Sequence, residues 1–91
     1  MTAVDTIERA LEITRKRLIV ALTFELFISA ETQLTYLLSL LTRQESDRSR
    51  LKNIIVGHFA VREFEESDPE LAAALLAAQN IASKMAKGLK V

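Results

Sequence analysis

Residues 18–41 read LIVALTFELFISAETQLTYLLSLL, and this stretch decides how the rest of the chain can fold. Its 24 residues hold only two charged side chains, Glu25 and Glu31, and neither Gly nor Pro interrupts them. The run is too long for one β-strand and lacks strict alternation, so it predicts an α-helix. A helix that is apolar around most of its circumference must be covered on most sides, so we expect it to be buried.

The same stretch is long enough to cross a membrane, and the basic run RKR at 15–17 precedes it. Each carboxylate near the middle of a bilayer would cost about 2.5–3.5 kcal/mol, which argues against a span. A secretory signal is disfavoured because an acidic, amphipathic segment comes first and Glu25 lies inside the apolar run. We therefore predict no membrane span and a cytoplasmic protein.

The size and composition of the chain favour self-association. Its 91 residues predict a single domain, 49% of them are apolar, and the formal net charge is zero. So small a domain has too much surface to hide that many apolar side chains alone, and zero net charge leaves copies without mutual repulsion. Both features predict a homodimer or a higher homo-oligomer. The chain has no cysteine, which excludes disulfides and thiolate metal sites, and we expect no metal and no cofactor.

One Pro and two Gly in the whole chain indicate an all-α fold. We predict an antiparallel bundle of three helices, over residues 3–43, 47–66 and 68–87, completed by dimerisation. A break of the long first helix near Ser29 would make four helices. The apolar stripe of the first helix and the residues that follow it form the candidate interface between copies: Val4, Ile7, Leu11, Leu18, Leu22, Phe24 and Phe27.

The motif SDPE at 67–70 is the clearest local signal. Ser67 or Asp68 can cap a helix, Pro69 suits its first turn, and Glu70 suits the positive end of the helix dipole. If Ser67 is the cap, Ser67 and Glu70 form a capping box. We expect one helix to end and the next to begin within residues 66–69.

Four polar residues fall on faces that the pattern makes apolar, and they are the candidate buried polar residues: Glu25, Glu31, His58 and Arg62. We expect Glu31 to be buried and paired with a base, with Arg62 or His58 as the first partners. Acid–base chemistry by buried carboxyl groups is the functional alternative to this structural interpretation.

No catalytic or ligand-binding motif is present, so the sequence favours a small non-enzymatic helical oligomer. Such a protein would act as an adaptor, a chaperone-like subunit or an accessory interaction protein, with a protein partner. One alternative is a nucleic-acid-associated regulator that uses the basic turn from Arg43 to Lys52. The neutral chain and the acids Glu45 and Asp47 inside that turn make nucleic-acid binding the weaker prediction. A second alternative is a small enzyme centred on Glu31 and His58.

Overall fold

The structure is a computed structural model that describes residues 1–91. Its helical elements, in chain order, are α1 (Ala3–Val20), α2 (Glu25–Leu41), the 3-10 turn η1 (Leu51–Asn53), α3 (Val56–Phe59), the π-helical turn η2 (Ala60–Phe64) and α4 (Pro69–Ala86). The chain contains no β-strand, so the predicted all-α class is confirmed.

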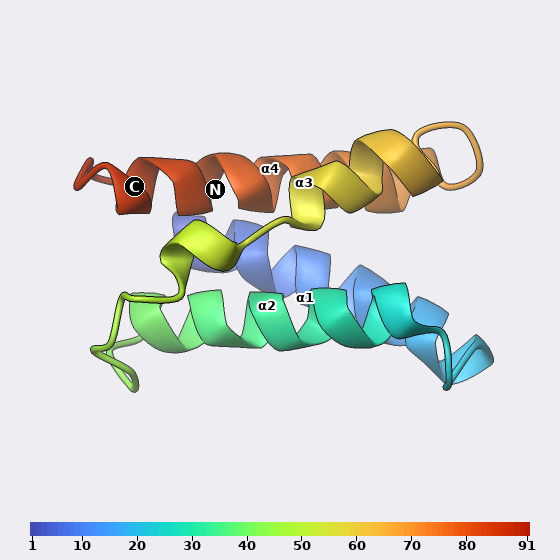
Figure 1. The fold of residues 1–91 in the computed structure, drawn as a ribbon, viewed down its shortest axis with the longest axis horizontal. Helices are drawn as coiled ribbons and strands as arrows, with labels where there is room; N and C mark the ends of the chain where they lie inside the picture. Colours follow the sequence, from blue (N-terminus) through green and yellow to red (C-terminus); the bar gives the residue numbers. More distant parts are fainter.

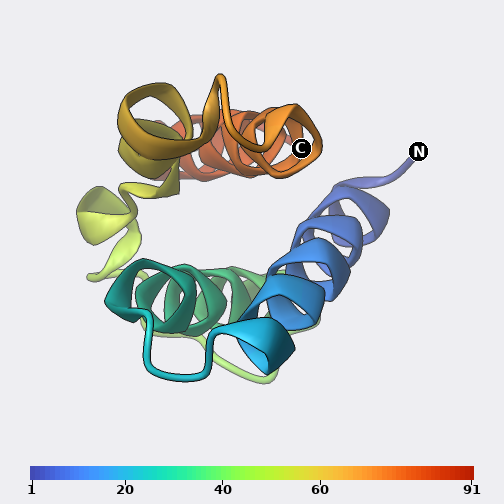
Figure 2. The same cartoon turned by 90° about the vertical axis from the view of Figure 1, so that its right-hand side faces the viewer.

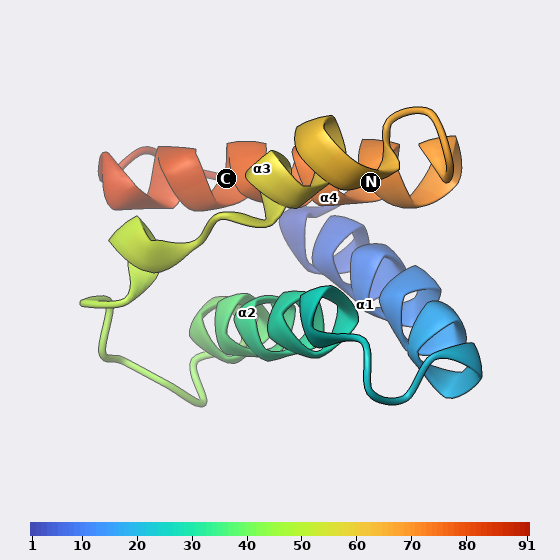
Figure 3. The same ribbon diagram turned by 45° about the vertical axis from the view of Figure 1, so that its right-hand side comes forward.

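The helices surround one apolar interior. Helix α1 packs against both α2 and α4, while α3 and η2 pack against α4. Figure 1 shows α2 and α4 running in the same direction, with α1 and the α3–η2 segment running the opposite way. In Figure 3, α1 crosses α2 at an angle on its way from the N-terminus to the turn that joins them. Twenty buried apolar side chains from these elements form the core, and Leu34, Leu37, Leu71 and Leu75 are fully covered.

The predicted long helix over residues 3–43 is wrong. Helix α1 ends at Val20 and α2 begins at Glu25, so the break also lies before the alternative position near Ser29. An unbroken helix of that length would span about 60 Å, whereas the longest dimension of the molecule is 33 Å. Folding back lets Leu34 of α2 share the core with Ile7 of α1 inside one chain.

The turn between α1 and α2 has no local stop signal. It contains neither Gly nor Pro, and Phe24 at the N-cap of α2 provides no side-chain hydrogen bond to the helix. The break therefore comes from tertiary packing, because burial of an apolar face contributes more to helix stability than local propensity does.

The predicted helix over residues 47–66 is wrong in its first half, where only the single turn η1 is helical. Side chains from two other helices bind the backbone just before and inside α3. Gln33 of α2 accepts from the N–H of Ile55 at 2.7 Å. Gln79 of α4 donates to the carbonyl of Ile54 at 3.0 Å and accepts from the N–H of Gly57 at 3.0 Å. These bonds replace the helical ones. The run of three β-branched residues at 54–56 is the sequence signal that could have indicated a weak helix here.

Helix α4 begins where the SDPE motif predicts. Asp68 is the N-cap, its Oδ1 accepting from the N–H of Leu71 at 3.3 Å, and Pro69 is the first helical residue. Ser67 is not the cap, because its hydroxyl donates to the carbonyl of Glu63 at 3.1 Å. The conditional capping box between Ser67 and Glu70 is therefore not formed.

Helices α2 and α4 end in the same C-terminal motif with different residues at its left-handed position. In each, the N–H two residues beyond the cap donates to the carbonyl five residues earlier at 2.9 Å, the pattern of a Schellman motif. The left-handed residue is Gly88 after α4, with φ of 75°, but Arg43 after α2, with φ of 63°. A side chain at such a φ is strained by the contact of its Cβ with the backbone.

Replacing Arg43 with glycine is therefore expected to raise the free energy of unfolding by about 0.5–1 kcal/mol, because glycine removes the Cβ strain but adds some freedom to the unfolded chain. Urea unfolding at neutral pH measures the change. Gly88→Ala is the matched control and should lower stability by a similar amount. An R43G variant less stable than the parent would show that the Arg43 side chain stabilises the fold in a way that outweighs its strain.

Candidate protein-interaction surface

Most of the polar residues that were predicted to be buried lie at the surface of the structure. Glu25, His58 and Arg62 are exposed, so the prediction that they are buried is wrong. Glu31 is half-buried, and its Oε2 accepts from Nε of Arg15 at 3.1 Å. Its partner is thus neither Arg62 nor His58. The break after α1 folds α2 back, which brings Glu31 to a residue 16 positions earlier in the chain.

The predicted interface along the first helix is wrong at its centre. Ile7 and Leu11 lie in the core of the single chain, at 0% and 2% exposure, and so they cannot contact a second copy. Val4, Leu18 and Phe27 are half-buried. Leu22 and Phe24 are exposed. The predicted interface residues that are exposed therefore lie at the turn between the first two helices and not along a helix stripe.

This turn carries a concentration of exposed apolar side chains, which we call the apolar turn: Ile19, Val20, Leu22, Phe24 and Ile28. Their exposed fractions run from 41% at Phe24 to 88% at Val20. The turn that joins α1 to α2 lies at one end of the molecule, at the front in Figure 2. Large apolar side chains exposed next to one another mark an interaction surface more often than single ones do.

Aromatic packing fixes the apolar turn to η2. The rings of Phe24 and Phe27 meet edge to face, with centroids 4.7 Å apart. Phe27 in turn stacks on the buried Phe64 at 5.5 Å. Three exposed carboxylates flank Phe64 in the sequence, and we call them the acidic rim: Glu63, Glu65 and Glu66. Contacts among the rings of Phe24, Phe27 and Phe64 thus connect the start of α2 to the segment that carries the acidic rim.

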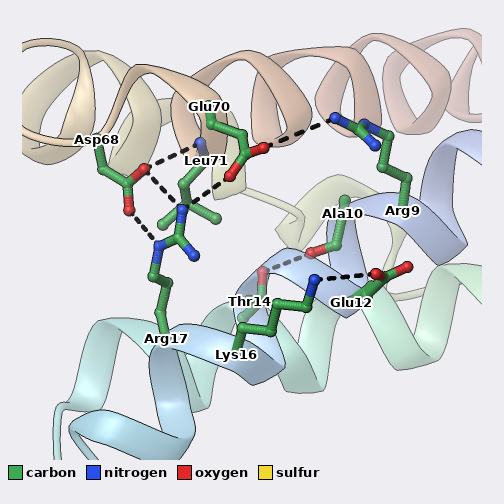
Figure 4. Close-up of polar contacts among 9 residues, drawn as sticks. All are labelled: Arg9, Ala10, Glu12, Thr14, Lys16, Arg17, Asp68, Glu70 and Leu71. Atoms are coloured by element: carbon green, nitrogen blue, oxygen red, sulfur yellow. Dashed lines mark hydrogen bonds and ion pairs between the residues drawn. The ribbon is translucent and has the colours of Figure 1, made fainter.

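An arginine clamp holds the end of α1 against the start of α4 (Figure 4). Arg17 donates from Nε to Oδ2 of Asp68 at 2.7 Å, and from Nη2 to Oδ1 of Asp68 at 3.2 Å and to Glu70 at 2.9 Å. Arg9 lies 3.8 Å from the other oxygen of Glu70. The hydrogen bonds from Arg17 hold the pKa of Asp68 below its ordinary value of 3.8, and the pKa of Arg17 is raised by the same bonds. The clamp lies three residues before Val20, so it fixes the base of the apolar turn.

The basic turn at 43–52 lies at the other end of the molecule (Figure 1). The guanidinium of Arg50 lies over the ring of Tyr36, 4.1 Å from its centroid. Arg48 donates to the carbonyl of Met85 at 3.4 Å. These two arginines therefore make contacts within the chain. No helix of the structure has the length and apolar character needed to cross a membrane.

Comparison with known proteins identifies relatives over the full length of the chain. The sequence model of the Tsi6 family matches residues 2–84. The immune protein Tsi6 of Pseudomonas aeruginosa is 42% identical over 91 residues, which cover all of this chain and 97% of that protein. A chain in the structure of Tse6 in complex with Tsi6 matches with a TM-score of 0.94 at 41% identity, over 99% of this chain and 96% of that one. The structure of Tsi6 from Pseudomonas aeruginosa matches with a TM-score of 0.86 at 41% identity, over 90% of this chain and 95% of that one. The chain therefore belongs to the Tsi6 family.

Proposed function

We propose that this chain is an immunity protein that binds a Tse6-related protein and blocks a harmful activity of that partner. The observation that carries the proposal is the full-length match to the immune protein Tsi6, together with the match to a structure of Tsi6 bound to Tse6. The fold of this chain thus corresponds over almost its whole length to that of a relative studied in complex with a protein.

The surface of the chain is suited to such a role. A protein interface needs apolar side chains that can be fully desolvated, surrounded by polar groups that remain near water. The apolar turn provides the first, and the acidic rim provides the second. The adaptor or accessory role predicted from the sequence is narrowed in this proposal to non-enzymatic inhibition of one partner.

The other predictions have less support. The enzyme hypothesis needs Glu31 beside His58, but Glu31 pairs with Arg15 and His58 is exposed on α3. The nucleic-acid hypothesis relies on the cations of the basic turn, where Arg48 and Arg50 contact Met85 and Tyr36 and the acids Glu45 and Asp47 lie between the cations in the sequence. A homo-oligomer and a cytoplasmic location stay predictions.

Co-expression tests the proposal. The tagged chain is produced in a bacterial host together with the Tse6-related protein of its own organism, and in a parallel culture with Tse6 of Pseudomonas aeruginosa. We expect the cognate pair to co-purify as a stoichiometric complex and the chain to restore growth of a host that the partner alone inhibits. Tsi6 with Tse6 from Pseudomonas aeruginosa is the positive control. Failure of the cognate pair both to co-purify and to restore growth would overturn the proposed function.

A further inference from the structure

We infer that the apolar turn is the docking surface for the partner protein, and that the partner presents there an apolar pocket bordered by basic side chains. The inference rests on the proposed function and adds to it the surface used and the chemistry of the surface that it meets.

The turns at the two ends of the molecule differ in composition. The turn at 42–50 reads TRQESDRSR and holds no apolar residue, as is usual for a solvated loop. The apolar turn instead exposes Ile19 by 73%, Val20 by 88% and Leu22 by 70%. A partner that covered these side chains would gain the free energy of removing them from water, and central apolar anchors of this kind dominate interface energies.

Contacts within the chain hold the apolar turn in place before any partner binds. The Arg17–Asp68 hydrogen bonds fix its beginning to α4. The contacts of Phe24 with Phe27, and of Phe27 with Phe64, fix its end to η2. Binding then orders few additional groups, which lowers the entropic cost of association.

The unpaired charges at the end of the molecule that holds the apolar turn are mostly negative. The cations next to the apolar turn are all in ion pairs within the chain: Arg15 with Glu31, Lys16 with Glu12, and Arg17 with Asp68. At the same end, four exposed carboxylates form no ion pair: Glu25, Glu63, Glu65 and Glu66. Arg62 is the one cation among them.

The opposite end, which holds the turn at 42–50 and the C-terminal end of α4 in Figure 1, has the reverse character. Its cations without an ion pair outnumber the acids Glu45 and Asp47: Arg43, Arg48, Arg50, Lys52, Lys84, Lys87 and Lys90. The two ends of the molecule thus carry opposite charge, although the net charge of the chain is zero. A partner that docks on the apolar turn meets a negative surround, and complementary charge requires the partner to be basic there.

A second copy of the chain is the less suitable occupant. Its basic end would match the acidic rim, but that contact joins one end of a molecule to the opposite end of the next. Such a head-to-tail contact continues into an open chain of molecules unless its rotation closes a ring. At the basic end the turn at 42–50 holds no apolar side chain, and Leu51 is buried. The exposed apolar side chains there, Leu89 and Val91, lie beyond the end of α4 and are altered in the control variant described below.

The test is a binding measurement by calorimetry between the chain and the Tse6-related protein of its organism. In the double variant V20S/L22S both altered side chains are at least 70% exposed, so the fold should survive, which thermal unfolding checks. We expect binding at least about tenfold weaker, as for the loss of interface anchors. The matched control is L89S/V91S, which alters two apolar side chains exposed by 56% and 48% at the other end and should leave affinity unchanged.

Charge reversal provides the second arm of the test. The triple variant E63K/E65K/E66K should slow association by about tenfold or more at low salt, whereas K84E/K87E/K90E should not slow it. Binding that V20S/L22S leaves intact would overturn the docking assignment alone. A dimer of the wild-type chain that V20S/L22S dissociates in sedimentation would also overturn it, in favour of a second copy. No binding by the wild-type chain would overturn the proposed function and this inference with it.

Discussion

Replacing Gly57 with alanine is expected to lower the free energy of unfolding by about 1–3 kcal/mol, the usual range for overpacking in a close-packed interior. A Cβ at this position would lie 2.7 Å from Cγ and 2.9 Å from Cβ of Gln79. The side chain of Gln79 cannot turn away freely, because its amide group bonds to both Gly57 and Ile54. Its Cβ is fixed by helix α4, so the segment that contains α3 would have to shift.

The sign of the stability change in G57A distinguishes packing against Gln79 from the local effect of helix propensity. Gly57 lies in α3 and its φ is not left-handed. Judged by helix propensity alone, alanine should therefore stabilise the chain by up to about 1 kcal/mol. Denaturant unfolding of G57A gives the sign directly. In a double-mutant cycle, the penalty for G57A should be smaller on a Q79A background, which removes the nearer of the two contacts. An equal penalty on both backgrounds would contradict the assignment to Gln79.

Replacing Arg17 with alanine is expected to lower the free energy of unfolding by about 1–3 kcal/mol, because it breaks charged hydrogen bonds between partly buried groups. Asp68 would lose two hydrogen bonds from the guanidinium and would keep the one from the N–H of Leu71. The contact with Glu70 should contribute little, since that side chain is 57% exposed. Arg17→Lys keeps the charge but not the two-point geometry, so it should recover only part of the loss.

The effect of Arg17 should depend on pH. The pKa of Asp68 in the folded chain lies below its ordinary value of 3.8, with the hydrogen bond from Arg17 as the largest cause. A carboxyl group with a lowered folded pKa contributes stability that is present above the unfolded pKa and is lost as the pH falls through the folded one. The difference between wild type and R17A should therefore be full at pH 7 and shrink below about pH 4. Urea unfolding at pH 7 and at pH 3 measures it, and a difference that grows in acid would contradict the role of Asp68.

The candidate interaction surface could be predicted only in part. Leu22 and Phe24 were among the expected interface residues, and both are exposed. The same prediction included Ile7 and Leu11, which the single chain buries. Ile7 and Leu11 were assigned to the interface because an unbroken first helix would leave its apolar stripe uncovered within one chain. The acidic rim is a local run in the sequence, but its place near the apolar turn depends on folding, through the stacking of Phe27 on Phe64.

The sequence by itself determined the all-α class, a polar break after residue 43 and a helix boundary within residues 66–69. Each depends on residues close together in the chain: few Gly and Pro, a run of polar side chains, and a cap next to a proline. Only the tertiary structure decided the break at 21–24, the irregular backbone at 54–55 and the pairing of Glu31 with Arg15. Contacts between distant residues control these features, because burying Leu34 beside Ile7 and bonding Gln79 to the backbone of Ile54 and Gly57 outweigh local helix propensity.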